Sequence, residues 1–148
     1  MEEFSIKGEN GNYLKITFQE IFGFPEKTCH WGGYELRATL EIKSGDFTAK
    51  SSLYTSTGEI YEFYTMLRDC NERLSGLASL ENFEGELKLS IQFTNLGQVN
   101  VSGSLSKVDA LHNELNFELN SDQSYITGTI DELKKIVAKY GGMSGLKS

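Results

Sequence analysis

The sequence contains few of the residues, and none of the motifs, on which catalytic and metal-binding sites are commonly built. Two histidines and two cysteines occur among 148 residues, and HExxH, Walker, GxGxxG and GxSxG motifs are missing. Cys29 and His30 are neighbours, yet successive residues of an extended chain point to opposite faces, which argues against a Cys–His nucleophile. We therefore expect no enzymatic activity, no metal and no cofactor.

Long apolar runs and an excess of basic residues are also missing. No run approaches the ~20 residues that span a bilayer, and the N-terminal Met1-Glu2-Glu3-Phe4 is acidic where a signal peptide is basic and then apolar. We expect a cytoplasmic protein without membrane contact, in which Cys29 and Cys70 stay free thiols rather than form a disulfide. The net charge of −7 argues against direct nucleic-acid binding, which favours a basic face.

Alternating apolar and polar residues predict β-strands along most of the chain. The pattern recurs in seven segments: residues 4–6, 14–18, 36–42, 47–53, 87–93, 99–105 and 115–119. Turn sequences at residues 10–12, 44–46 and 95–97 make several connections short, which favours antiparallel neighbours.

Two segments have helical spacing instead. Apolar stripes run through residues 60–74 and 130–140, with Ser56 and Thr129 as expected N-caps. Residues 57–63 align with residues 127–133 at an offset of 70, which suggests a repeat of strands followed by a helix, residues 1–74 and 75–142. Chance similarity of two strand-to-helix junctions is the alternative.

The predicted fold is a single α+β domain, residues 1–148, with two amphipathic helices on a strongly bent antiparallel β-meander of seven to eight strands. A flat sheet of that size would be ~35 Å wide, more than two helices of ~10 Å can cover. The sheet must therefore curl or split into two packed layers, as in a sandwich with helices at its end.

The candidate partner-binding residues are one aromatic side chain and two groups of acids. Trp31 lies in the irregular aromatic stretch 22–34, which is either a binding loop or a loop folded over the core. The acids are Glu81, Glu84 and Glu86 in one group and Asp109, Glu114, Glu118 and Asp122 in the other. An acidic surface can steer a basic partner, although solvated charge on a wet sheet face is the simpler interpretation of either group.

The sequence resembles the WapI-type immunity proteins, partners of secreted wall-associated-protein toxins in bacteria. The resemblance is carried by Phe22-Gly23-Phe24-Pro25, Cys29-His30-Trp31-Gly32-Gly33-Tyr34-Glu35, Leu40 to Gly45, Ser52 to Tyr61 and Phe83-Glu84-Gly85. It implies a small cytoplasmic protein that neutralises a cognate toxin domain by stoichiometric binding. A basic nuclease is one partner that the net charge would suit, with carboxylates replacing phosphates in its groove.

Two other functions remain open at this point. A small-molecule or glycan binder could line the mouth of a curled sheet with Trp31 and Tyr34. An interaction domain of another system is the second. The sequence leaves the oligomeric state undetermined, because a free strand edge can pair with a second copy or with a partner's strand.

Overall fold

The computed structural model describes residues 1–108 and 111–146, which form eight antiparallel strands and two α-helices. The elements are β1 (Glu3–Lys7), β2 (Tyr13–Ile21), β3 (Glu35–Ser44), β4 (Phe47–Ser56), α1 (Thr57–Arg73), β5 (Gly76–Glu81), β6 (Leu87–Phe93), β7 (Gln98–Val108), β8 (His112–Asp122) and α2 (Gln123–Tyr140). The predicted α+β class and antiparallel pairing are confirmed. Across the described ranges, no helix is long and apolar enough to cross a membrane.

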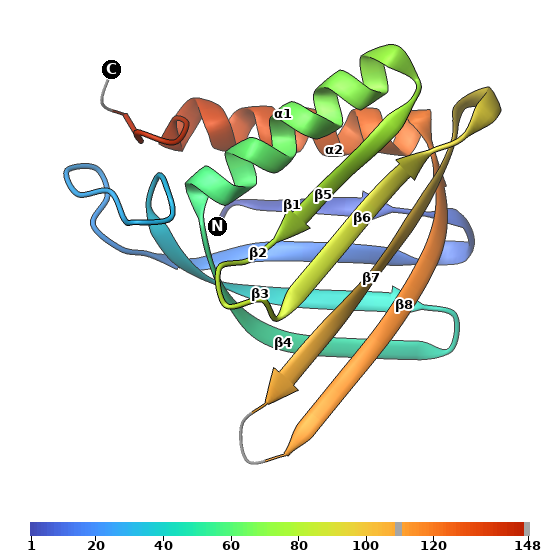
Figure 1. Cartoon of the computed structure of the whole chain (residues 1–148), viewed down its shortest axis with the longest axis horizontal. Helices are drawn as coiled ribbons and strands as arrows, with labels where there is room; N and C mark the ends of the chain where they lie inside the picture. Colours follow the sequence, from blue (N-terminus) through green and yellow to red (C-terminus); the bar gives the residue numbers. More distant parts are fainter. Residues whose placement is uncertain (109–110, 147–148) are drawn as a thin grey trace.

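The strands form two four-stranded sheets, in the orders β1-β2-β3-β4 and β5-β6-β7-β8. The meander is interrupted by α1, which separates β4 from β5 in the chain. Figure 1 shows the second sheet lying across the first, with both helices along one side of the pair. Division into two sheets explains how two helices suffice to cover the strands. Each sheet buries one face against the other, and the helices close the remaining side.

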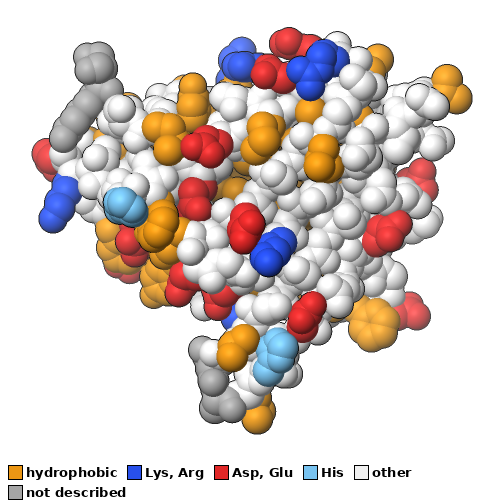
Figure 2. All heavy atoms as spheres, viewed as in Figure 1, with side chains coloured by type: hydrophobic (Ala, Val, Ile, Leu, Met, Phe, Trp, Pro, Cys, Tyr) orange, Lys and Arg blue, Asp and Glu red, His pale blue; other side chains and the backbone are white. Residues whose placement is uncertain are grey.

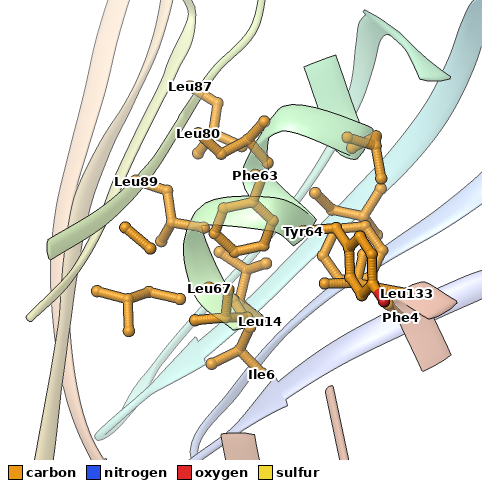
Figure 3. Packing of buried hydrophobic residues seen from close by; sticks show 14 of the residues in the cluster. Phe4, Ile6, Leu14, Phe63, Tyr64, Leu67, Leu80, Leu87, Leu89 and Leu133 are labelled. Carbon is orange, nitrogen blue, oxygen red and sulfur yellow. The ribbon is translucent and has the colours of Figure 1, made fainter. Parts of the chain in front are cut away.

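The apolar residues of both sheets and both helices form a single core. The inward positions of β2 and β3, Leu14 and Leu40 among them, are fully buried, as their alternation predicts. In Figure 3, Phe63 and Leu67 of α1 lie among leucines from both sheets. The helix therefore joins the two layers rather than covering one of them.

Each helix packs along the first strand of the other half of the chain. α1 lies against β5, and α2 lies against β1. The hydroxyl of Thr129 in α2 donates to the carbonyl of Ser5 (2.6 Å), and the Ser5 N–H donates to the Glu132 carboxylate (3.0 Å). Side chains of α2 thus take up hydrogen-bonding groups along the outer edge of β1.

The helix starts confirm one predicted cap and overturn the other. The Ser56 hydroxyl accepts from the Glu59 N–H (3.1 Å), as expected for α1. For the second helix the predicted cap, Thr129, is wrong. The N-cap is Asp122, whose carboxylate accepts from the Tyr125 N–H (3.0 Å), so the helix begins seven residues earlier than predicted. The helix starts are therefore 66 positions apart rather than 70, a spacing that also matches buried Leu67 with buried Leu133.

Replacing Thr129 with Val should lower the free energy of unfolding by about 1–2 kcal/mol, because the Ser5 carbonyl loses its partner inside packed structure. The matched control is Thr65→Val in α1, whose hydroxyl bonds to Glu62 of its own helix at the surface. The control should change stability by less than about 0.5 kcal/mol. Urea denaturation of the two variants measures both values, and equal losses would contradict a special role for the contact between α2 and β1.

Candidate functional site: an aromatic surface surrounded by carboxylates

The loop between β2 and β3 is held in place from two sides. The Gly58 N–H at the start of α1 donates to the Gly32 carbonyl (3.1 Å), and the Gly33 N–H donates to the Met143 carbonyl (2.7 Å) near the C-terminus. A Cβ on Gly58 would lie only 2.4 Å from the Gly32 carbonyl carbon, so the approach of loop and helix requires glycine there. The neighbouring Trp31 therefore sits on a fixed loop.

Trp31 stacks on Phe83 of the β5–β6 turn. The ring centroids are 5.2 Å apart and the rings are nearly parallel, at 2°, while His30 contacts Trp31 edge-on at 4.9 Å. Trp31 is 44% exposed. Asn82 fixes the β5–β6 turn that carries Phe83, because its side-chain amide donates to the Tyr54 carbonyl of β4 (2.9 Å). Two rigid connections thus present a half-exposed aromatic surface.

Carboxylates lie on the segments that adjoin this surface. Glu81 and Glu84 flank Phe83 in the chain and are exposed. The Ser56 hydroxyl, which caps α1 by accepting from the Glu59 N–H, lies 3.5 Å from the Trp31 carbonyl oxygen. The start of α1 therefore adjoins the aromatic pair. A shallow hollow of about 220 Å³ between α1 and β5 is lined by Glu59, Glu62, Met66, Ser79, Leu80 and Glu81.

We call this surface the Trp31 patch and define it by His30, Trp31, Glu59, Glu62, Glu81, Phe83 and Glu84. Figure 2 shows acidic side chains beside exposed hydrophobic ones on the side of the molecule where the β2–β3 loop and the start of α1 lie. Rings with nearby carboxylates suit a partner side chain with an apolar stem and a positive end.

Glu59 is the most perturbed acid of the patch. Burial raises its pKa to about 7. The hydrogen bond from the Thr55 hydroxyl (3.0 Å) and those with Ser56 act in the opposite direction and lower the pKa. The nearby Glu62 charge raises the pKa further. A carboxyl in this state is only partly ionised at neutral pH and would gain from a cation placed beside it.

The structure brings some of the eight predicted residues together and separates others. Trp31, Glu81 and Glu84 meet in the Trp31 patch. Glu86 instead pairs with Lys107 (3.1 Å), which also donates to the Ser52 carbonyl (2.7 Å).

Of the remaining four acids, Glu114, Glu118 and Asp122 belong to β8. Glu114 and Glu118 are exposed on β8, away from Trp31. Asp122 has a structural task as the cap of α2, where hydrogen bonds from Ser124 and the Tyr125 N–H lower its pKa. Asp109 lies outside the described residues.

Four members of the patch are not among the predicted partner-binding residues: His30, Glu59, Glu62 and Phe83. Phe83 is a lone aromatic among acids, Glu59 had been assigned only as part of a cap, and Glu62 follows it three residues later on one helix face. Their common location results from packing between segments far apart in the chain. The Glu59/Glu62 spacing places both carboxylates on one helix face, but it does not indicate that this face lies near Trp31.

The glycan-binding alternative expected Trp31 and Tyr34 to line one pocket. Tyr34 is instead fully buried, and its hydroxyl donates to the Pro25 carbonyl (2.9 Å). The two side chains therefore do not form the expected site. Among the described residues, no three His, Cys, Asp or Glu side chains are grouped as a metal ion would require.

Replacing Glu59 with Gln should flatten the pH dependence of stability between about pH 4.5 and pH 8. The pKa of Glu59 is higher in the folded chain than the ordinary 4.5, so the folded state holds the proton more tightly. The resulting stability is present below pH 4.5 and is lost as pH rises through about 7. At pH 8 the variant should be more stable than the parent by about 1 kcal/mol, allowing for solvent screening of a half-exposed group.

Urea denaturation at several pH values measures this effect. The control Glu62→Gln, exposed on the same helix, should keep most of the parental pH dependence. If Glu59→Gln and the parent lose stability in parallel between pH 5 and pH 8, Glu59 does not titrate as the structure indicates.

No curated protein and no solved structure matches the chain. The family described as "Immunity protein WapI-like family" matches residues 5–141, which include both sheets, both helices and the whole Trp31 patch. The chain therefore belongs to the WapI-like immunity protein family.

Proposed function

We propose that this protein neutralises a cognate toxin domain by binding to it stoichiometrically in the cytoplasm, with the Trp31 patch as the central contact. The observation that carries the proposal is the half-exposed Trp31–Phe83 stack, with Glu59, Glu62, Glu81 and Glu84 on adjoining segments, in a chain of an immunity protein family. A role in binding requires only a presented surface, whereas catalysis would require converging reactive groups.

The aromatic pair supplies the apolar part of such a contact. Tryptophan is strongly enriched among residues that dominate binding energy, and these residues lie at the centre of interfaces inside a polar rim. The patch contains both components, stacked rings and carboxylates on the adjoining segments. Because loop and turn are fixed by hydrogen bonds to α1, β4 and the C-terminal segment, little entropy should be lost on binding.

The carboxylates define the kind of partner. Exposed acids next to an anchor residue favour a basic surface and accelerate its approach. A basic nuclease domain fits this requirement, since its substrate groove attracts phosphates and would accept carboxylates in their place. Covering that groove would block nucleic acid without any chemistry by the immunity protein.

The decisive experiment is co-expression with the C-terminal domain of a toxin-like protein encoded next to this chain. Cells should grow only when this chain is present, and the two proteins should co-purify in equal amounts. A toxin domain that kills regardless of this chain would overturn the proposal.

Trp31→Ala should abolish protection and weaken the complex by about 2–4 kcal/mol, because the substitution removes the central ring and the face of Phe83 it covers. The matched control is Phe47→Ala at the β3–β4 turn, where an aromatic side chain is 72% exposed away from the patch. Isothermal titration calorimetry with the co-purified toxin domain measures both variants. Equal affinities for the two variants would exclude the patch as the central contact.

The double variant Glu81→Gln/Glu84→Gln should slow association several-fold at low salt and little at about 0.5 M salt, where charges are screened within a few ångströms. The control Glu3→Gln/Glu9→Gln removes the same charge from exposed positions of β1 and the β1–β2 turn. Stopped-flow association rates separate the two. A control that slows association as much as the patch variant would mean that net charge, rather than this surface, steers the partner.

A further inference from the structure

The outer edges of the two sheets differ in how far they are covered. α2 lies along β1, and α1 lies along β5. On β4, side chains take up the edge carbonyls: Lys107 donates to Ser52 (2.7 Å) and Asn82 donates to Tyr54 (2.9 Å). Within the described residues, the first halves of β4 and β8 extend beyond such cover. The free half of β4 carries Lys50, a residue type that keeps edges from pairing. Figure 1 shows the first half of β8 projecting past the first sheet.

The orientation of the free backbone groups of β8 follows from one hydrogen bond. The Ser44 hydroxyl donates to the Glu118 carbonyl (2.6 Å), so this carbonyl points away from β7. Alternate residues of a strand present their backbone groups on the same side, so His112, Glu114 and Asn116 also direct N–H and C=O outward. Within the described part of the chain, no hydrogen bond reaches these three outward pairs.

The free edge lacks the features that usually keep a strand edge from pairing. Natural edges are interrupted by bulges, proline or lysine. From His112 to Glu118, β8 pairs with β7 in unbroken register and contains no proline, lysine or arginine. Seven residues at ~3.3 Å each give an exposed edge of about 20 Å, the length of an ordinary strand.

The charge on this edge selects what can pair with it. Glu114 and Glu118 are exposed, and their cross-strand neighbours on β7 are the uncharged Ser106 and Ser102. Pairing two copies edge to edge would bring acidic strands together, which is unfavourable. A strand with lysine or arginine at alternate positions would instead place positive charge beside both carboxylates.

We propose that the edge of β8 from His112 to Glu118 binds an extended basic segment of the toxin, which adds a ninth strand to the protein. Backbone hydrogen bonds to the outward groups of Glu114 and Asn116 hold the segment, and the carboxylates of Glu114 and Glu118 select its basic side chains. The proposal rests on the proposed function and adds a second contact to the Trp31 patch.

A peptide titration tests the edge without the toxin. The probe is a short peptide of alternating lysine and valine, added to the isotopically labelled full chain, with a peptide of alternating glutamate and valine as control. We expect amide NMR shifts concentrated at residues 112–118 and slower exchange of the Glu114 and Asn116 N–H groups with the basic peptide only. No shifts, equal shifts with both peptides, or shifts centred on the Trp31 patch would overturn the proposal.

A proline substitution tests the edge in the complex. Asn116→Pro removes an outward N–H but no hydrogen bond to β7, and edge strands tolerate proline at such positions. Toxin binding should weaken about tenfold, whereas Asn116→Ala should bind within about twofold of the parent. Lys50→Pro removes the equivalent outward group from β4 and should leave binding unchanged. Circular dichroism melting establishes that each variant is folded.

The outcomes separate this proposal from the proposed function. If the parent protects cells and binds the toxin, and Asn116→Pro binds equally well, the edge is not a contact while the function stands. If the parent neither protects nor binds, the proposed function fails, and the peptide titration still decides whether the β8 edge accepts a basic strand.

Discussion

The structure depends on the exchange of helices between its two halves. Each half is a four-stranded meander followed by a helix, and each helix packs along the first strand of the other half. Neither sheet could bury its apolar face with its own helix alone, since the core is one cluster drawn from all layers. The chain ends reinforce the arrangement: Lys139 at the end of α2 pairs with Glu2 (2.9 Å), and the Tyr140 hydroxyl donates to the same carboxylate.

This arrangement also creates the functional surface. α1 must enter the core at its first turn to reach β5, and that turn brings Gly58 against Gly32 and the Ser56 cap beside Trp31. β5 then leads straight into the turn that carries Phe83. The stacking of Trp31 on Phe83 is therefore a consequence of where α1 crosses between the sheets, and the carboxylates at the start of the helix come with it.

Local pattern predicted much of this fold. Alternation located seven strands because each has one buried face, and the Ser56 cap followed from its spacing to Glu59. Strand β5 was not predicted because it has apolar residues on both faces, exposed Leu77 beside buried Ala78 and Leu80, so its alternation is not visible in the sequence. The start of α2 was misplaced because Thr127, Gly128 and Thr129 look like a turn, whereas Asp122 caps the helix earlier. The grouping of Trp31 with Glu81 and Glu84 depends on tertiary packing, so no local pattern could have revealed it.

The acids of this chain serve different physical purposes, and their neighbours distinguish them. Asp122 and Glu86 have hydrogen-bonding or ionic partners within the fold, so their charge is already compensated. Glu59 is half-buried, and burial raises its pKa to about 7. Glu114 and Glu118 face uncharged serines across the strand pair, and their side-chain partners are the amide of Asn100 (2.9 Å) for Glu118 and the imidazole of His112 (3.9 Å) for Glu114, so no lysine or arginine of the described residues pairs with either. Because an uncompensated carboxylate is stabilised by whichever cation arrives, these acids rather than the net charge as a whole define the surfaces on which a basic partner gains most.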